Sequence, residues 1–439
     1  MAPRSLAAFL KAARSALTAP ASQRPKPLTL VIGNESADLD SLCSAILLAY
    51  FRSHTPPHNA SLHVPLCNLP RADLALRPEL QAALAGTSSV PKLKSDSDST
   101  PDTQGGVPLD SLITLSELPD DLVADDTKWL LVDHNALTGN LAKRFQSSVA
   151  GCIDHHVDEG VVPTNVYGFP RVIETCGSCA SLVVEYAQDA WRQLSEQEPD
   201  QTTDRVLARL ALAPILVDTS SLKSANKTTD TDRRAAAVAE AVLGVSGEGK
   251  SAFNASYETD AEYNRSAYYD ELSRLKNDLS TFTYSDILRK DYKQWTEKTR
   301  SGGSLTVGFS TVSQGLGYLL KNIGDKNALL DGLYTHAKER NLDIAVIMTV
   351  QHDEGGFARQ LLLWALNEPA VHAVKRFVET NTDKLDLKPW GDGQQDTTAS
   401  DSGEWHTCWT HRTEFSRKQI APLLRDAMKS WLWKTTQML

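Results

Sequence analysis

The sequence predicts an α/β protein of two domains: an N-terminal domain built on a doubly wound parallel sheet, and a smaller C-terminal α/β domain with a mixed sheet. Over residues 1–244, apolar runs of strand length alternate with stretches of helical periodicity, which is typical of a parallel sheet covered by helices. A stretch rich in glycine and serine at 244–251 interrupts this pattern, and a second alternation follows. A length of 439 residues suits two or three domains. We therefore expect domains at 1–244 and 261–439, joined by a linker at 245–260.

The elements of the N-terminal domain follow from the periodicity of each segment. Short apolar runs predict strands, whereas apolar residues that recur every three or four positions predict helices. The expected strands are 28–32, 129–132, 149–153 and 214–217. The expected helices are 41–51, 177–191, 206–213 and 231–243. The polar run at 95–106 is rich in breaker residues and is expected to be a surface loop.

The same criteria divide the C-terminal domain. Its expected helices are 260–278, 284–295, 317–341, 370–378 and 416–433. Its expected strands are 305–309, 344–350, 360–364 and 405–410. The polar run at 382–403 is expected to be a loop.

Composition excludes several classes of protein. A formal net charge of −10 argues against general binding to nucleic acid or to anionic membranes. No apolar run reaches the roughly 18 residues of a membrane span. The six cysteines lack the spacing of a disulfide framework, and Cys176 and Cys179 have no second pair with which to hold zinc. We expect a reducing compartment and a cytoplasmic location.

The first residues allow a second location. No acidic residue precedes Glu35, and Arg4, Lys11 and Arg14 lie among alanine, leucine and serine, which is compatible with a mitochondrial presequence. We favour a short amphipathic helix packed on the first domain. The sequence does not decide between cytosol and mitochondrion.

Acidic motifs follow four of these apolar runs. Asp38 and Asp40 follow the first run, and the others lead into Asp133-His134-Asn135, Asp154-His155-His156 and Asp218. Since ligands of open α/β sheets bind beyond the carboxyl ends of the strands, these side chains can meet at one edge. A single aspartate after a strand is more often a helix cap or turn former. The ordered set is harder to explain by capping alone.

Crowded carboxylates predict a metal site. Asp38, Asp40, Asp133 and Asp218 carry a combined charge of −4, whose burial without cations would be costly. Carboxylates together with an imidazole suit Mg²⁺ or Mn²⁺, and also Co²⁺. We expect two divalent ions, which together can activate a bridging hydroxide and stabilise both oxygens of a phosphoryl transfer.

These motifs resemble those of the DHH phosphoesterase superfamily over nearly the whole chain. Motif I matches residues 33–41, motif II matches Asp133-His134-Asn135, motif III is Asp154-His155-His156, and motif IV lies around Asp218. The Gly-Gly-Gly-His motif of RecJ-type nucleases and nanoRNases is absent from the sequence. Instead, Ser416-Arg417-Lys418 and the segment around Lys293 resemble the branch that holds family II inorganic pyrophosphatases, fungal exopolyphosphatases and prune proteins.

One position discriminates within that branch. Family II pyrophosphatases carry a metal-binding histidine where this chain has Asn34, and asparagine there resembles the fungal cytosolic-type exopolyphosphatases. An amide is a poorer ligand than imidazole for transition metals, so we expect weaker binding at that metal site and a preference for Mg²⁺, Mn²⁺ or Co²⁺. Prune proteins often alter motif III, which is intact here.

The resemblance implies a role for each matched residue. Asp133 and Asp218 would bridge the two ions, Asp38 with Asn34 would hold one, and Asp40 with His155 the other. His156 would face the substrate phosphate or orient a ligand, Asp154 would orient His155, and His134 would give similar support. Arg417, Lys418 and Lys293 would bind the polyanion from the C-terminal domain, with the active site in the cleft between domains. Gly177 and Ser178, which open a helix, could offer backbone N–H groups to phosphate or could serve only as a cap.

The expected reaction is release of terminal orthophosphate from inorganic polyphosphate, and we expect the protein to be a monomer. The alternatives are an inorganic pyrophosphatase, a nucleotide phosphodiesterase, or a prune-like regulatory protein without catalysis. Asn34 argues against the first, the absent glycine-rich motif against the second, and the complete ligand set against the third.

Overall fold

The computed structural model describes residues 2–85, 106–165, 167–197, 201–245, 263–353, 356–393 and 403–430. The chain divides into two compact units, Met1–Lys276 and Asn277–Leu439. The predicted linker at 245–260 and the predicted loop at 95–106 lie almost entirely outside the described residues. Within the described part of the chain, no helix combines the length and the apolar character needed to cross a membrane.

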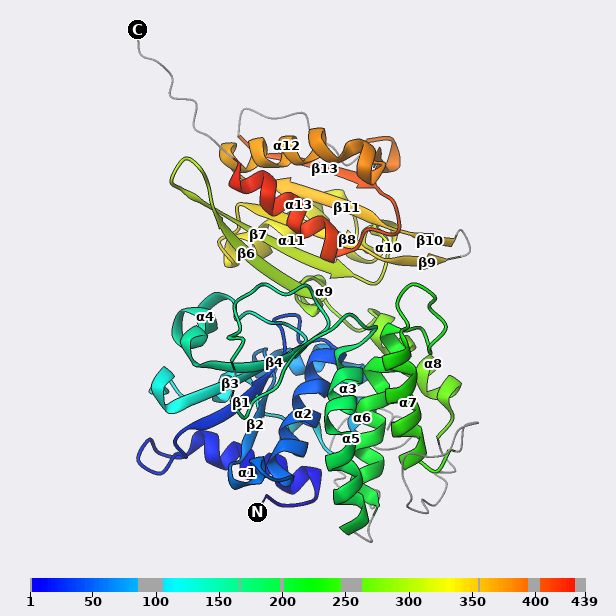
Figure 1. The fold of residues 1–439 in the computed structure, drawn as a ribbon. Helices are drawn as coiled ribbons and strands as arrows, with labels where there is room; N and C mark the ends of the chain where they lie inside the picture. The colour runs from blue at the N-terminus through cyan, green and yellow to red at the C-terminus, as the bar shows by residue number, and fades with distance from the viewer. Residues whose placement is uncertain are drawn as a thin grey trace. The chain divides into compact units, whose positions relative to one another are not determined.

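The N-terminal unit contains the predicted parallel sheet (Figure 1). Its five strands run in the order β2-β1-β3-β4-β5, and each neighbouring pair is parallel. Their bounds are β1 (Leu28–Ile32), β2 (His63–Leu66), β3 (Thr127–Val132), β4 (Val149–Asp154) and β5 (Arg171–Ile173). The carboxyl ends of β1, β3 and β4 therefore lie side by side at one edge of the sheet.

Helices cover both faces of this sheet, as the doubly wound prediction requires. Along β1, Leu28, Leu30 and Ile32 belong to one apolar core and Val31 to the other, which is the two-residue alternation of a strand buried on both faces. The helices are α1 (Leu6–Thr18), α2 (Leu39–His54), α3 (Pro78–Leu84), α4 (Gly139–Phe145), α5 (Cys179–Gln197), α6 (Thr202–Asp218), α7 (Asp230–Val242) and α8 (Arg265–Asn277). Residues of α2, α5, α6 and α7 fill the core around Val31, and residues of α4 pack in the core around Leu30.

The predicted amphipathic helix at the N-terminus is confirmed. Ser5 caps α1 by accepting a hydrogen bond from the backbone N–H of Ala8. One face of the helix is buried in the N-terminal unit, through Leu6, Phe9, Leu10, Ala13 and Leu17.

The strand predicted at 214–217 is wrong, because α6 continues through it to Asp218. The residues from Val206 to Leu216 are all buried, so an apolar run here has no exposed side to give a periodicity. Such a run cannot be assigned to helix or strand by its pattern. Pro214 lies inside the helix, where it lacks the N–H that would bond to the preceding turn. Asp218 is thus the last residue of a helix, not the residue after a strand.

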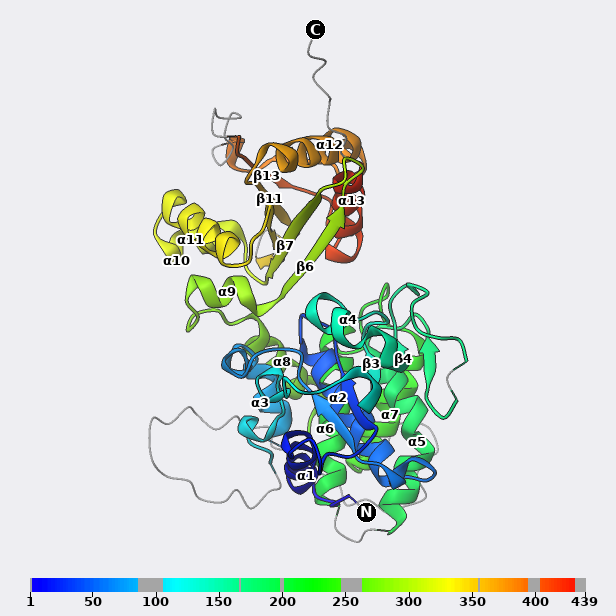
Figure 2. The ribbon, with the colours of Figure 1, turned by 90° about the vertical axis from the view of Figure 1, so that its left-hand side faces the viewer.

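The C-terminal unit contains the predicted mixed sheet (Figure 2). The strand order is β12-β13-β11-β8-β7-β6; β7 and β8 are parallel, and the other neighbours are antiparallel. The strands are β6 (Tyr292–Lys298), β7 (Ser304–Val312), β8 (Ile344–Thr349), β11 (Gln360–Ala365), β12 (Lys388–Pro389) and β13 (Trp405–Thr410), with a separate pair β9 (Gln351–Asp353) and β10 (Gly356–Ala358). One face packs α12 (Glu368–Leu385) and α13 (Arg417–Lys429), and the other packs α9 (Tyr284–Lys290), α10 (Leu316–Ile323) and α11 (Lys326–Glu339).

Two predicted boundaries shift in this region. The helix predicted at 284–295 ends at Lys290, and the strand β6 begins at Tyr292. The helix α8, predicted within the C-terminal domain, packs with the N-terminal core: Tyr268 and Leu272 are buried there, and the Tyr268 hydroxyl donates to the carbonyl of Arg209 at 3.0 Å. The compact units therefore divide after Lys276, beyond the predicted domain start at 261.

Acid should destabilise the N-terminal unit through His63, which is buried at the start of β2. Burial and the guanidinium of Arg52 lower the pKa of His63 to about 3. In the unfolded chain this pKa is near 6.5, so unfolding takes up a proton below that pH. We expect the free energy of unfolding to fall as the pH drops from 6.5 toward 3, by about 1.4 kcal/mol per pH unit from this residue.

Urea unfolding at several pH values in this range measures the slope. The variant His63→Gln keeps an acceptor for the Arg52 Nε–H, which lies 3.2 Å from His63 Nε2, but it cannot titrate and should show a shallower slope. His372→Gln, on the exposed side of α12, is the control and should keep the wild-type slope. Equal slopes for wild type and His63→Gln would contradict the prediction.

Candidate active site

The loop after β1 brings the first acidic motif to the edge of the sheet. Asp38 caps α2 by accepting a hydrogen bond from the Ser41 N–H at 3.0 Å, so the chain turns directly from the strand into the helix. This turn requires glycine at position 33, because a Cβ there would lie 2.5 Å from the Cβ of Ser41. Motif I is therefore held against the end of β1 by close backbone packing.

Asp133, which follows β3, lies at the centre of the cluster and is only 3% exposed. Its Oδ2 accepts hydrogen bonds from Asn34 Nδ2 at 2.7 Å and Ser41 Oγ at 2.6 Å. Its Oδ1 lies 3.2 Å from His155 Nε2 and 3.7 Å from His156 Nδ1. One donor atom from each of Asp133, His155 and His156 lies within 4.8 Å of the others, which is close enough for a shared metal ion.

The two histidines are oriented by different partners. His155 Nδ1 lies 3.0 Å from the carbonyl of Cys176, whereas His156 Nδ1 lies 2.8 Å from Asp154 Oδ1. We expected Asp154 to orient His155; the structure instead pairs Asp154 with His156, whose backbone N–H also donates to it. The tight turn after β4 explains the difference, because it points the imidazole of His156, two residues on, back toward Asp154.

Asp40 is buried at the N-terminus of α5 and is 3% exposed. It accepts hydrogen bonds from Ser178 Oγ, the N–H of Cys179 and the N–H of Ala180 at 2.7–2.9 Å. A carboxylate in this position interacts favourably with the positive end of the helix dipole. Asp40 therefore couples the second helix of the unit to the fifth.

Asp218, at the end of α6, completes the acidic set. Its Oδ1 lies 3.8 Å from Lys276 Nζ at the end of α8. Burial raises the pKa of Asp38, Asp133 and Asp218 raise it further, and Lys276 lowers it, so the charges of these three residues all act on Asp38. Lys276 was not predicted, since nothing in its local sequence distinguishes it from a solvated helix residue.

The electrostatics of the cluster indicate a place for cations. Burial, followed by Asp133 and Asp218, raises the pKa of Asp38 and raises that of Asp40 well above the usual range. Burial opposes the charged form of His155, but hydrogen bonds to Asp133 and Cys176 outweigh it and raise the pKa of His155 to about 11. Carboxylates that destabilise one another beside an imidazole are the donor set that divalent ions occupy. The residues present therefore fit the predicted divalent metals.

Three of the four acidic loops contain a residue in the left-handed region of backbone space that is not glycine. Ala37 has φ 44°, Asp133 has φ 60°, and Ser220, Ser221 and Leu222 follow Asp218 with φ between 53° and 63°. Such backbones cost energy and persist only where the surroundings hold them in place. No sequence signal marked these positions, because none of them is glycine.

Hydrogen bonds show the surroundings of the other N-terminal residues that the sequence singled out. Asn34 donates to both the side chain and the backbone carbonyl of Asp133, and its Oδ1 accepts from the Ser36 N–H at 2.8 Å. His134 Nδ1 lies 2.9 Å from the carbonyl of Val132. The N–H groups of Gly177 and Ser178 donate to Asp232, which supports the capping alternative over phosphate binding.

The predicted cations of the C-terminal unit lie at one end of its sheet. Arg417, in the first turn of α13, donates to the Asp291 carbonyl at 3.2 Å and to Thr311 Oγ1 at 3.1 Å, and its Nη2 lies 2.8 Å from Asp291 Oδ1. Lys293 shares a face of β6 with Trp295, which packs in the core under α13. Lys293 and Arg417 are thus on the same face, and Lys418 is exposed beside Arg417.

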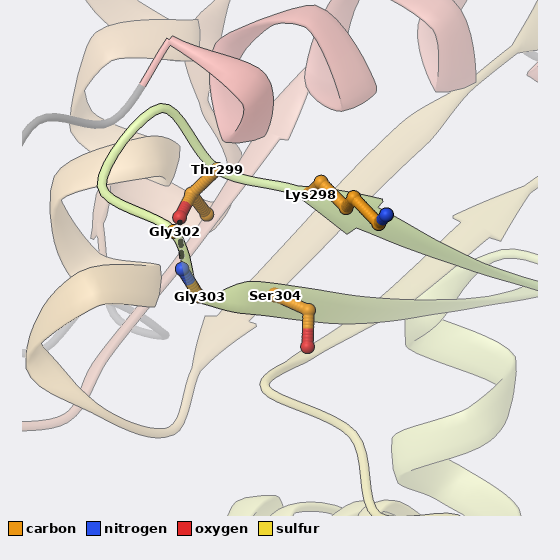
Figure 3. Close-up of a pocket in the computed structure, with 5 residues that line it drawn as sticks. All are labelled: Lys298, Thr299, Gly302, Gly303 and Ser304. Carbon is orange, nitrogen blue, oxygen red and sulfur yellow. Dashed lines mark hydrogen bonds between the residues drawn. The ribbon is translucent and has the colours of Figure 1, made fainter.

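A pocket in the C-terminal unit lies away from these residues (Figure 3). It has a volume of about 410 Å³ and is lined by Lys298, Thr299 and the turn between β6 and β7. In the turn, the Gly303 N–H donates to Thr299 Oγ1 at 3.2 Å. The pocket contains a single charged residue and no predicted site residue, so it does not compete with the acidic cluster as the place of chemistry.

Comparisons with known proteins agree with this geometry. Residues 29–215 match the model of the DHH family N-terminal domain, and residues 270–427 match that of the DHHA2 domain. The chain is 31% identical over 404 residues to a Schizosaccharomyces pombe protein named "Putative exopolyphosphatase", with 91% of each chain covered. It is 25% identical over 430 residues to human "Exopolyphosphatase PRUNE1", covering 96% of this chain and 79% of that protein.

A solved structure shows the same fold. It is described as a "putative family II inorganic pyrophosphatase" from Methanococcus jannaschii and aligns with a TM-score of 0.53 at 18% identity, covering 91% of this chain and 99% of that one. The acidic motifs, the parallel and mixed sheets and these matches agree. The chain therefore belongs to the DHH phosphoesterase superfamily, with a DHH domain followed by a DHHA2 domain.

Proposed function

We propose that the protein is an exopolyphosphatase, which hydrolyses the terminal phosphoanhydride of inorganic polyphosphate and releases orthophosphate. The observation that carries the proposal is the convergence of Asp133, His155 and His156 at one edge of the parallel sheet. The names of the relatives in yeast and human support polyphosphate as the substrate.

The proposed cofactors are two divalent ions, Mg²⁺ or alternatively Mn²⁺ or Co²⁺. Asp133 and Asp218 would contact both ions, Asp38 would hold one, and Asp40 with His155 would hold the other. When bound, such ions lower the pKa of a water molecule and neutralise charge on the reacting phosphate. The side chain of Asn34 supports this arrangement indirectly, since its amide group holds the carboxylate of Asp133 in place.

His156 is the proposed contact for the scissile phosphate. Its side chain is 25% exposed, and Asp154 accepts from its Nδ1 side, which leaves Nε2 directed to another partner. A carboxylate behind an imidazole fixes the orientation and the tautomer of the ring. His156 is thus suited to hold a phosphate oxygen or to supply a proton to the leaving group, and His134 is proposed to support the same loop.

The C-terminal unit is proposed to bind the rest of the chain of phosphates. Arg417 offers a planar donor pair, and Lys418 and Lys293 add positive charge beside it. Asp291 holds the Arg417 guanidinium at 2.8 Å, which fixes its direction before a phosphate arrives. The predicted monomeric state and cytoplasmic location are not required by this chemistry and stay predictions.

The direct test is phosphate release with Mg²⁺ from long-chain polyphosphate and from pyrophosphate, side by side. We expect fast release from polyphosphate and little from pyrophosphate. The reverse result would make the protein a pyrophosphatase with asparagine in place of a ligand histidine. Release from neither substrate would favour a nucleotide phosphodiesterase or a regulatory protein, which assays with dinucleotides then separate.

Loss of either shared carboxylate should nearly abolish turnover. Asp133→Asn keeps a side chain that tolerates the left-handed backbone and removes only the charge, and Asp218→Ala removes the ligand at the end of α6. We expect kcat to fall by at least about 100-fold in each, more than the loss typical of groups around a ligand. Steady-state phosphate release measures this.

Asp189→Ala is the control for these variants, because its side chain lies on the exposed side of α5, where it pairs with Arg192. Its activity should match the wild type. If purified and folded Asp133→Asn or Asp218→Ala turns over at the wild-type rate, the two-metal proposal is wrong.

Arg417→Ala should raise the KM for polyphosphate by about 10-fold with little change in kcat, since the loss of one charge-assisted hydrogen bond is worth about 1.5–3 kcal/mol before screening by water and salt. Initial rates over a range of polyphosphate concentrations measure both constants. Arg376→Ala, on the exposed side of α12, removes the same charge elsewhere and should leave KM unchanged. An unchanged KM in Arg417→Ala would show that this residue is misassigned.

A further inference from the structure

One short turn orients two of the proposed metal ligands at once. The turn comprises residues 176–180, between β5 and the first residues of α5. At its beginning, the carbonyl of Cys176 lies 3.0 Å from His155 Nδ1. At its end, Ser178 Oγ and the N–H groups of Cys179 and Ala180 all donate to Asp40. The position of this turn therefore decides where both ligands point.

Asp232, near the start of α7, also binds the turn at 176–180. It is 0% exposed, and its carboxylate accepts from the Gly177 N–H at 2.9 Å and the Ser178 N–H at 3.2 Å. It also accepts from Ser181 Oγ at 2.7 Å and from both the N–H and the hydroxyl of Thr229. Five donors thus saturate this carboxylate, and they come from the starts of two helices, α5 and α7.

The backbone of Gly177 is packed so closely that the turn has no room for a side chain at this position. A Cβ at residue 177 would lie 2.5 Å from Thr219 Cγ2, 2.9 Å from Asp232 Oδ2 and 3.0 Å from the Lys227 carbonyl. Thr219 directly follows the proposed ligand Asp218. The backbone of the turn is therefore packed between the end of α6 and the carboxylate of Asp232. Removal of the charge on Asp232 would leave buried N–H donors without an acceptor and would allow the turn to move.

We infer that Asp232 is a positioning residue of the metal centre, acting through the turn at 176–180 to set the directions of Asp40 and His155. Asp232 itself would touch neither metal nor substrate. This inference rests on the proposed function, because it assumes that Asp40 and His155 bind metal. Groups that orient ligands in this way contribute strongly to metal affinity in other proteins.

The test is Mn²⁺ binding to the purified full chain, measured by isothermal titration without substrate. Asp232→Asn retains the size of the side chain, but its amide group must face at least one backbone donor. We expect the dissociation constant for Mn²⁺ to rise by about 10–100-fold. Asp230→Asn is the matched control: it removes the same charge from the same turn of α7, but Asp230 is exposed, and its affinity should equal that of the wild type.

Ser178→Ala is a second, milder variant, which removes only the hydroxyl bond to Asp40 and leaves Asp232 with its donors. It should weaken Mn²⁺ binding less than Asp232→Asn, and it decides the matter if Asp232→Asn does not fold. Wild-type Mn²⁺ affinity in a folded Asp232→Asn variant would overturn the inference, and so would equal losses of affinity in Asp230→Asn and Asp232→Asn. If Asp232→Asn is unfolded, wild-type affinity in Ser178→Ala would overturn it. If the wild type itself binds no Mn²⁺, the proposed metal centre fails, and the inference falls with it.

Discussion

The burial of several carboxylates at the edge of one parallel sheet is the constraint on which the N-terminal unit depends. Asp40 and Asp133 are each 3% exposed. Burial raises the pKa of Asp38 and of Asp40, and the charges of Asp133 and Asp218 raise both further. Burial of like charges is unfavourable unless positive groups face them. The surrounding structure supplies hydrogen-bond donors and positive groups. The donors are the N-terminus of α5, the amide of Asn34 and the hydroxyl of Ser41, and the groups that can carry positive charge are His155 and Lys276. The raised pKa of Asp38 and Asp40 shows that this supply is incomplete, which is consistent with a role in holding cations.

The same constraint explains why the framework around the site is so closely fitted. Two buried carboxylates share the N-terminus of α5. Asp232 accepts from the N–H groups of residues 177 and 178, and Asp40 accepts from those of residues 179 and 180. Left-handed backbone at Ala37, Asp133 and Ser220 adds strain at the same edge. Stability elsewhere must compensate for that strain, and α2, which is buried along nearly its whole length, contributes to it.

The C-terminal unit presents basic side chains instead. Lys293 of β6 and Arg417 at the start of α13 lie on one face of its mixed sheet, where Asp291 and Thr311 hold the guanidinium in a fixed direction. Under the proposed function, the acidic unit would hold the cations, and the basic side chains of the second unit would bind the polyanionic substrate. The family match spans both units.

The sequence by itself determined the class of fold, the strands β1, β3 and β4, the mixed C-terminal sheet and the residues of the acidic motifs, because periodicity and motif spacing are local properties of the chain. The tertiary structure alone decided that 214–217 is helical, that α8 packs with the N-terminal core, that Asp154 orients His156, and that Asp232 occupies the N–H groups of Gly177 and Ser178. A fully buried apolar run has no polar face from which to read its period. A hydrogen-bond partner is chosen by distance in space, and Asp232 and Gly177 are 55 residues apart in the chain.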